Sequence, residues 1–270
     1  MKKILFTIFI FAVAAAALAH EFWLQPQQFI FNKGETASIR FNAGENFTGE
    51  NWTGNKSRVQ TLIHYLPSGK RADVSALLSD NKGDSLQLPL QEEGTHMVVF
   101  NSVNSFINLE PEKFNEYLKE DGLNNAAKYR KQHNEENING KEYYQRSVKT
   151  LLQVGNIKAH AIIEKTDLPL DIVPSKNIYA AIDKTKMKFT VFFKQQPLPN
   201  TSVRVWRNYP GQALITKKFT TNRKGQITAD ISLPGQWMVS CVHMERNTAD
   251  TTADWQSYWA SVTFGYYISI

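Results

Sequence analysis

Short segments in which apolar and polar residues alternate, separated by turn residues, constrain the fold of this chain most strongly. Ala37–Phe41 and Lys186–Lys194 alternate in this way, and Val59–Leu66 is another strand-like segment. Alternation with a period of two places one face of a strand in a core and the other toward solvent. Many short strands at this spacing are typical of β-sandwiches. We therefore predict a mainly β protein.

One pair of these segments predicts a hairpin. Leu86–Leu90 and Thr95–Phe100 flank the turn-like sequence Gln91–Gly94. Two apolar runs separated by a few residues that include glycine commonly pair with each other.

Residues 109–152 break the pattern of short strands. Pro111 stands where a helix can begin, and Gly122 where it can end. Apolar residues recur here at helical spacing; they are Phe114, Tyr117 and Leu118, followed later by Tyr144, Val148, Leu151 and Leu152. We expect a helical insertion of two or three helices at 109–152.

The chain is long enough for two domains. We expect an N-terminal β domain at 20–166, which contains the helical insertion, and a C-terminal β-sandwich at 167–270. The succession of strands around Pro197–Asn200, Asn222–Gly225 and Pro234–Gly235 resembles the transthyretin-like or carboxypeptidase-regulatory sandwich. That resemblance implies a fold and no activity.

The first residues predict export. Lys2 and Lys3 precede an apolar run, Ile4–Ala19, which ends in the small-residue pattern Ala17-Leu18-Ala19. This arrangement is typical of a cleavable signal peptide, and the run is short for a membrane span. We therefore expect residues 1–19 to be removed and a soluble, periplasmic protein that begins at His20 and has no membrane span.

Charge and cysteine content exclude several classes of protein. The formal net charge is only +6, and no basic stripe interleaved with aromatic residues predicts nucleic-acid binding. Cys241 is the single cysteine, so no internal disulfide can form. It lies in an apolar strand, where a thiol usually packs as a small hydrophobe. The sequence also contains no nucleophile elbow, phosphate loop, dinucleotide fingerprint or His-Glu-x-x-His motif. We do not expect an enzyme.

His20 is the residue that most directly suggests chemistry. As the first residue of the exported chain it would offer a free α-amine and an imidazole. Two such nitrogens can chelate a transition metal, and nitrogen-rich sites suit nickel, cobalt, copper and zinc. The unperturbed pKa of an α-amine, about 7.7–8.0, lets a metal displace its proton near neutrality. A histidine could equally follow a cleavage site by chance.

A second histidine would complete the predicted metal site. His243 ends a strand just before a polar loop, and His96 begins one. Sites are commonly built where strands meet loops, so we rank His243 first and His96 second. We interpret His64 and His160 as partly buried strand residues and His133 as a solvated one.

Tryptophan offers a different interpretation. Six tryptophans occur in the chain, among them Trp255 and Trp259 near its end. Aromatic residues on an exported β-sandwich can stack on sugars, although they more often fill a core.

Several segments together resemble a known family. They are His20–Leu24, Leu170–Pro174, Pro197-Leu198, Trp237–Val239 with Val242–Met244, and Trp255–Tyr266. The family is an exported one of unknown function, labelled as a nickel uptake transporter family or periplasmic component of a cobalt transport system. The resemblance implies a periplasmic protein associated with metal transport, which would need a separate membrane transporter as its partner.

These observations leave three hypotheses. The first is a periplasmic protein that binds a divalent transition metal ion (Ni²⁺ or Co²⁺ by resemblance, copper by chemistry) through His20, His243 and His96, and delivers or buffers it for uptake. The second is a metal-free envelope- or carbohydrate-binding module that uses surface tryptophans. The third is a copper monooxygenase built on an N-terminal histidine.

Overall fold

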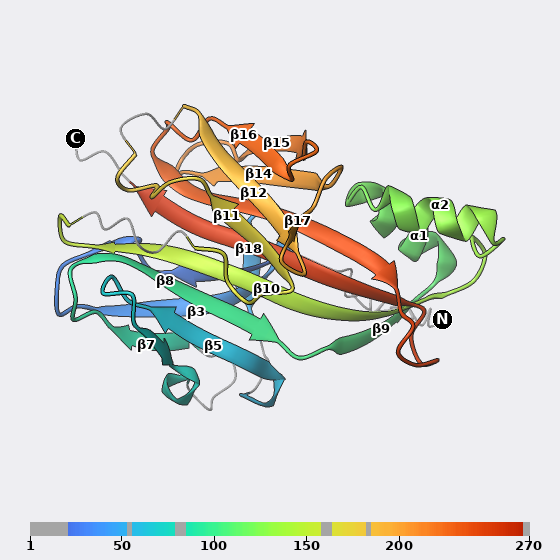
Figure 1. Ribbon diagram of the computed structural model, residues 1–270, viewed down its shortest axis with the longest axis horizontal. Helices are drawn as coiled ribbons and strands as arrows, with labels where there is room; N and C mark the ends of the chain where they lie inside the picture. The colour runs from blue at the N-terminus through green and yellow to red at the C-terminus, as the bar shows by residue number, and fades with distance from the viewer. Residues whose placement is uncertain (1–20, 53–55, 79–84, 158–163, 182–184, 267–270) are drawn as a thin grey trace, which may run out of the picture.

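Three stacked β-sheets make up most of the molecule (Figure 1). The structure, a computed structural model, describes residues 21–52, 56–78, 85–157, 164–181 and 185–266. The prediction of a mainly β, sandwich-like protein is confirmed.

The middle layer, called here the central sheet, has ten strands. Along its main path the order is β15 (Ile215–Thr220), β14 (Ser202–Asn208), β17 (Gly235–Arg246), β18 (Trp255–Tyr266), β10 (Gly140–Val154), β8 (Gly94–Ser102), β5 (Val59–Tyr65) and β6 (Arg71–Asp73). Two further strands pair with β10, namely β2 (Ile30–Phe31) and β9 (Ser105–Leu109).

A smaller sheet covers each face of the central sheet. The N-terminal layer contains β1 (Glu21–Pro26), β3 (Thr36–Glu45), β4 (Thr48–Asn51) and β7 (Ser85–Pro89). The C-terminal layer contains β11 (Leu170–Pro174), β12 (Met187–Phe193), β13 (Gln196–Pro197) and β16 (Gln226–Ala229). Two short 3₁₀ helices, η1 (Lys56–Arg58) and η2 (Ser75–Leu77), flank β5 and β6.

Alternation along β10 shows how the three layers pack. Val148 and Leu152 belong to the core beneath the N-terminal layer, whereas Leu151 belongs to the core beneath the C-terminal layer. Successive side chains of a strand point to opposite faces, so β10 is buried on both sides. The same alternation holds in β8, where Val98 and Val99 enter different cores.

The central sheet crosses the predicted domain boundary. β10 and β18 pair in parallel, with Glu142–Thr150 opposite Trp255–Thr263. The boundary between residues 166 and 167 falls in the connection from β10 to β11. The two predicted units therefore share the central sheet, and each adds one outer layer of its own.

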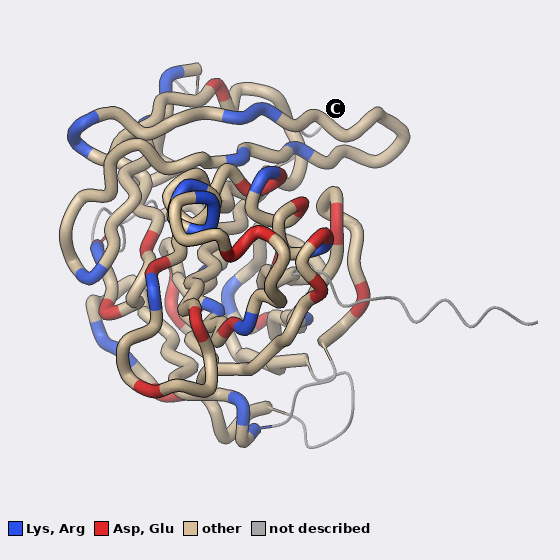
Figure 2. The backbone as a smooth tube through the Cα atoms, turned by 90° about the vertical axis from the view of Figure 1, so that its right-hand side faces the viewer, with Lys and Arg blue, Asp and Glu red and all other residues tan. Residues whose placement is uncertain are grey.

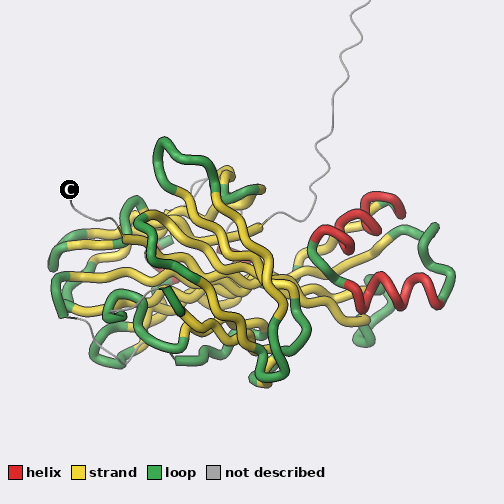
Figure 3. The backbone as a smooth tube through the Cα atoms, turned by 90° about the horizontal axis from the view of Figure 1, so that it is seen from above, coloured by secondary structure: helices red, strands yellow, loops and turns green. Residues whose placement is uncertain are grey.

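Both helices lie together at one end of the molecule, beyond the outer layers (Figure 3). This helical lobe consists of α1 (Pro111–Glu120) and α2 (Asn124–Gln132). Phe114, Tyr117 and Leu118 of α1 pack with Trp255 and Trp259 of β18. Pro111 at the start of α1 is confirmed. Gly122 follows the helix with a φ of +69°, a conformation that favours glycine.

The predicted helix over Tyr144–Leu152 is wrong. These residues lie in β10, which is buried on both faces at its C-terminal end. Polar residues such as Lys149, Thr150 and Gln153 are buried in this strand beside the apolar ones. Burial on both faces therefore removes the two-residue alternation, and the apolar positions fall at helical spacing by chance. The helical part of 109–152 is therefore confined to α1 and α2.

The predicted hairpin of Leu86–Leu90 with Thr95–Phe100 is also wrong. Both segments are strands, but β7 pairs with β3 in the N-terminal layer and β8 pairs with β5 and β10 in the central sheet. The turn between them carries the chain from one layer to the next, so their apolar faces meet across a core.

A buried ion pair joins the central sheet to the C-terminal layer. Lys149 of β10 contacts Asp171 of β11, and their side chains are only 2% and 0% exposed. The other carboxylate oxygen of Asp171 accepts hydrogen bonds from the amide and hydroxyl of Thr166 at 2.7 and 3.0 Å. Neither charge has access to water, so each depends on the other.

Replacing Lys149 alone should therefore destabilise the protein strongly. Breaking a buried pair leaves an uncompensated charge and typically costs about 3–5 kcal/mol. We expect Lys149→Met to lower the free energy of unfolding by this amount in urea denaturation. The double variant Lys149→Met/Asp171→Leu should recover much of the loss, because no charge then stays buried. Equal stability of Lys149→Met and the unaltered protein would contradict this assignment.

Candidate functional site

The first described residues are held firmly against the body. Phe22, Trp23 and Leu24 of β1 are at most 2% exposed. The backbone carbonyls of Phe22 and Leu24 each accept a hydrogen bond of 2.7 Å from hydroxyls of β18, those of Ser261 and Thr263. β1 therefore crosses the face of the central sheet at β18 as a fixed strand.

Glu21, at the start of β1, belongs to a charge network around Arg204 of β14. The Arg204 Nη1 donates to Glu21 Oε1 at 3.2 Å and also bonds Asp121, which follows α1. Its Nη2 donates to the carbonyl of Glu120 at 2.6 Å. One guanidinium thus joins three parts of the molecule: β1, the end of α1 and β14.

The network contains two buried carboxylates and one cation. Burial raises the pKa of Glu21 to about 7, although Arg204 opposes this rise and Asp121 adds to it. Burial also raises the pKa of Asp121 against the effect of Arg204. When both carboxylates are ionised the network carries a net negative charge, so a proton or a further cation would be bound favourably.

A groove of about 510 Å³ opens beside this network. Its lining includes Glu21, Asp121 and Arg204, and exposed charged residues from other elements surround them, namely Glu45, Glu116, Glu120 and Lys218. Figure 2 views the end of the molecule that carries the helical lobe, where acidic and basic positions lie side by side. Five carboxylates against two cations give the lining an excess of acidic groups, an arrangement that attracts positive charge.

His20, the predicted principal ligand, lies outside the described residues. In the sequence it directly precedes Glu21, which lines the groove. The predicted sharing of one metal ion by His20 and His243 stays a prediction.

His243 is placed on the other face of the central sheet. Its ring packs against Phe193 of β12, with ring centroids 4.3 Å apart. Within β17, Val242 faces the helical lobe, whereas His243 and Cys241 point to the other face, where Cys241 belongs to the core of the C-terminal layer. Within β14, Val203 and Val205 belong to that same core, so Arg204 between them points to the opposite face. The Glu21 network around Arg204 therefore lies on the opposite face of the central sheet from His243.

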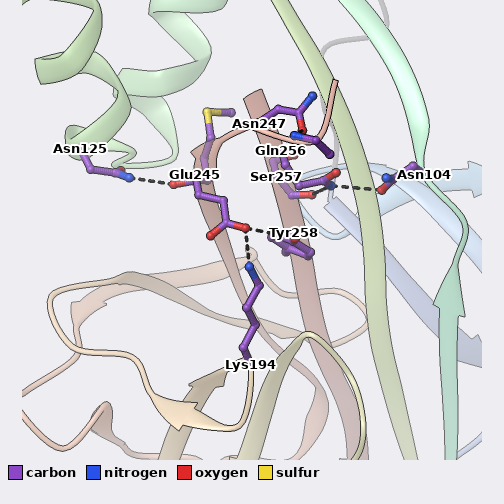
Figure 4. Close-up of polar contacts among 10 residues, drawn as sticks. Asn104, Asn125, Lys194, Glu245, Asn247, Gln256, Ser257 and Tyr258 are labelled. Carbon is purple, nitrogen blue, oxygen red and sulfur yellow. Dashed lines mark hydrogen bonds and ion pairs between the residues drawn. The ribbon is translucent and has the colours of Figure 1, made fainter. Parts of the chain in front are cut away.

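Tyr258 of β18 lies opposite His243 in the strand register, and Glu245 follows His243 two residues along β17. Figure 4 shows Glu245 and Tyr258 with Lys194. Lys194 forms a 2.6 Å ion pair with Glu245, whose carboxylate also accepts a 3.3 Å hydrogen bond from the Tyr258 hydroxyl. Burial lowers the pKa of His243, and Glu245 opposes that effect. The neutral imidazole could ligate a metal, but the carboxylate of Glu245 is already paired with Lys194 and would have to leave that pair to add a second ligand.

His96 is fully buried and already bonded on both ring nitrogens. Its Nδ1 lies 2.8 Å from Nε2 of His64, and its Nε2 lies 2.8 Å from the carbonyl of Glu92. The carbonyl can only accept, so His96 Nε2 donates to it and His64 Nε2 donates to His96 Nδ1. This pair faces the core of the N-terminal layer, and β10 and β18 separate it from β17. The structure therefore does not bring His96 and His243 together.

Two other candidates are core residues. Cys241 is buried, and burial raises its pKa far above the ordinary value for a thiol. Five of the six tryptophans are at most 5% exposed: Trp23, Trp206, Trp237, Trp255 and Trp259. Only Trp52 is partly exposed. Trp255 and Trp259 therefore fill the core of the helical lobe.

The described residues supply no ready-made metal centre. Within residues 21–52, 56–78, 85–157, 164–181 and 185–266, no group of three or more His, Cys, Asp or Glu side chains could hold an ion. Over the same ranges, no helix has the length and apolar character needed to cross a membrane.

Comparison with known proteins identifies the family. A domain of unknown function, DUF4198, matches residues 17–245. The chain belongs to the DUF4198 family. No curated protein matches the sequence. A solved structure of the D0-D1 domain of intimin aligns with 90% of this chain and 97% of its own, at 12% identity and a TM-score of 0.21. A similarity at that level carries no argument about this DUF4198 chain.

Sequence reasoning missed the Arg204 network. Glu21, Asp121 and Arg204 are far apart in the chain, and each looks like an ordinary surface charge. The one local signal was Asp121-Gly122, which directly follows a predicted helix. It marks the end of that helix but does not indicate which residue Asp121 contacts.

The His64–His96 pair should make stability depend on pH. Burial, followed by the charge of His96, lowers the pKa of His64 to about 4. Its unfolded value is about 6.5, so the unfolded chain binds more protons between these values. Stability contributed by the neutral pair is therefore present above pH 6.5 and is lost as pH falls toward 4, by up to about 3 kcal/mol.

Urea denaturation from pH 7 to pH 4 measures this loss. The double variant His64→Leu/His96→Leu should show a shallower pH dependence. His133→Ala, which removes a histidine exposed at the surface, should keep the original slope. Identical slopes for the double variant and the unaltered protein would contradict the role given to the pair.

Proposed function

We propose that this DUF4198 protein is an exported, periplasmic binding protein for a divalent transition metal ion, Ni²⁺, Co²⁺ or copper, which it delivers to or buffers for a membrane transporter. The observation that supports the proposal most is the groove beside Glu21. Its two buried carboxylates outnumber the one partly buried guanidinium, and its lining includes Glu21, the residue that follows His20 in the sequence.

The proposed ligand set centres on the first residue of the processed chain. The α-amine and imidazole of His20 supply two nitrogens, and a carboxylate of the groove supplies an oxygen. Glu21 is the favoured carboxylate because it lines the groove and because burial, which Arg204 only partly offsets, raises its pKa and so makes a further cation favourable. A bound dication would stabilise its ionised form and release the proton.

The fixed position of β1 supports this ligand set. β1 is fixed by the Ser261 and Thr263 hydroxyls and by the buried side chains of Phe22 and Trp23. A terminus attached to a fixed strand loses less conformational freedom on binding a metal than one on a loose tail. The tryptophan-based alternative receives less support, because five of the six tryptophans are buried.

Isothermal titration of Ni²⁺, Co²⁺ and Cu²⁺ into protein beginning at His20 tests the proposal. We expect binding in the micromolar range or tighter, with proton release that grows below pH 7. One glycine added before His20, or His20→Ala, should weaken binding by roughly tenfold or more, since each removes a nitrogen ligand. Glu21→Gln should weaken it as well.

Two variants serve as controls. His133→Ala removes an exposed histidine and should leave the affinity unchanged. His243→Ala distinguishes the groove site from the site that the sequence predicts, in which His20 and His243 share the ion. For the groove site the affinity should stay unchanged, because His243 faces the opposite side of the central sheet. Absence of micromolar binding, or binding that is indifferent to the added glycine, would overturn the proposal. A large loss in His243→Ala alone would move the site to the other face.

A further inference from the structure

Arg146 of β10 is a cation surrounded by aromatic rings. Its guanidinium carbon lies 4.4 Å from the ring centre of Phe22, 5.2 Å from that of Tyr144 and 5.6 Å from that of Trp52. Phe22 and Trp52 also contact each other edge to face, with centroids 5.5 Å apart. The guanidinium is thus held against three rings that come from β1, β10 and the end of β4.

No anion compensates this charge among the described residues. The Arg146 backbone amide donates to the Ser102 hydroxyl at 2.9 Å, but its guanidinium forms no hydrogen bond or ion pair with any residue in the described ranges. Among the described residues, every other arginine whose guanidinium lies over an aromatic ring also forms an ion pair or a side-chain hydrogen bond. These arginines are Arg71, Arg130, Arg207 and Arg246.

The surroundings of Arg146 disfavour its positive charge. Burial lowers the pKa of Arg146; Tyr144 opposes this effect and the positive charge of Arg58 adds to it. Arg58 belongs to η1, and its side chain is exposed. Two arginines therefore repel each other, and no carboxylate of the described residues is among the groups that shift the pKa of Arg146. A bound anion would relieve this repulsion.

The geometry indicates the shape of that anion. The contacts with the three rings occupy none of the guanidinium N–H groups in hydrogen bonds to described residues, so these groups can serve as donors. This planar fork matches a carboxylate in a bidentate arrangement. Trp52, the one partly exposed tryptophan, and Tyr144, also partly exposed, provide apolar surface beside the fork for the body of an organic acid.

We propose that Arg146, assisted by Arg58 and flanked by Trp52 and Tyr144, binds a small organic carboxylate. This site is separate from the acidic groove and does not depend on metal binding. Free phosphate shares the negative charge but offers no apolar body, so the proposal predicts that it binds more weakly than an aromatic carboxylate.

The proposal is tested by titrating benzoate, acetate and inorganic phosphate into the full processed chain. Two-dimensional NMR of the tryptophan indole N–H groups monitors each titration. Benzoate should shift one indole resonance, assigned to Trp52 by its loss in Trp52→Phe. Acetate and phosphate should bind at least threefold more weakly. Arg146→Lys keeps the charge but removes the fork, and should weaken benzoate binding by tenfold or more. Arg58→Gln should weaken it less.

Arg71→Gln is the matched control. Arg71 also stacks on a tyrosine, with its guanidinium carbon 4.7 Å from the ring centre of Tyr65, but it is paired with Glu164. Its loss should leave benzoate binding unchanged. A benzoate affinity that is the same in Arg146→Lys, no indole shift at millimolar benzoate, or tighter binding of phosphate than of benzoate would each overturn the proposal. If Arg146→Lys does not fold, the Trp52 indole shift in the unaltered protein decides the question.

Discussion

The parallel pairing of β10 with β18 is the contact on which the rest of the structure depends. Almost all other strand pairs are antiparallel, as in an ordinary sandwich. Parallel neighbours need a long connection between them, and here that connection contains the whole C-terminal layer together with β14, β15 and β17. Closing this pair turns two segments, each with strands and an outer layer of its own, into one continuous sheet with a core on either face.

The groove follows from this junction. β1 comes from the first segment and lies across β18 of the second, where the Ser261 and Thr263 hydroxyls hold its carbonyls. That placement brings Glu21 to Arg204, and the end of α1 brings Asp121 to the same guanidinium. The acidic groove is therefore built from both segments. In contrast, the rings around Arg146 all come from the first segment, so that site requires only the N-terminal layer and β10.

Residue patterns predicted local structure well and long-range pairing poorly. Alternation in Lys186–Lys194 located β12, and Pro111 and Gly122 bounded α1, because those signals depend on neighbouring residues. The same rules mistook β10 for a helix, since a strand buried on both faces loses its alternation. They also paired Leu86–Leu90 with its neighbour in sequence. For the site, the sequence pointed to His20, but the partnership of Glu21, Asp121 and Arg204 depends on strand order, which no local pattern encodes.

Native-state hydrogen exchange tests most directly whether the β10–β18 junction makes the chain one unit. With rising urea, the slowest amides of β5 and β8 in one half and of β14 and β17 in the other should converge on a single free energy of opening, shared by β10 and β18. That result is expected if the two segments can only unfold together. Two groups of amides with different opening free energies, divided at the β10–β18 contact, would show two independently stable domains and contradict the account.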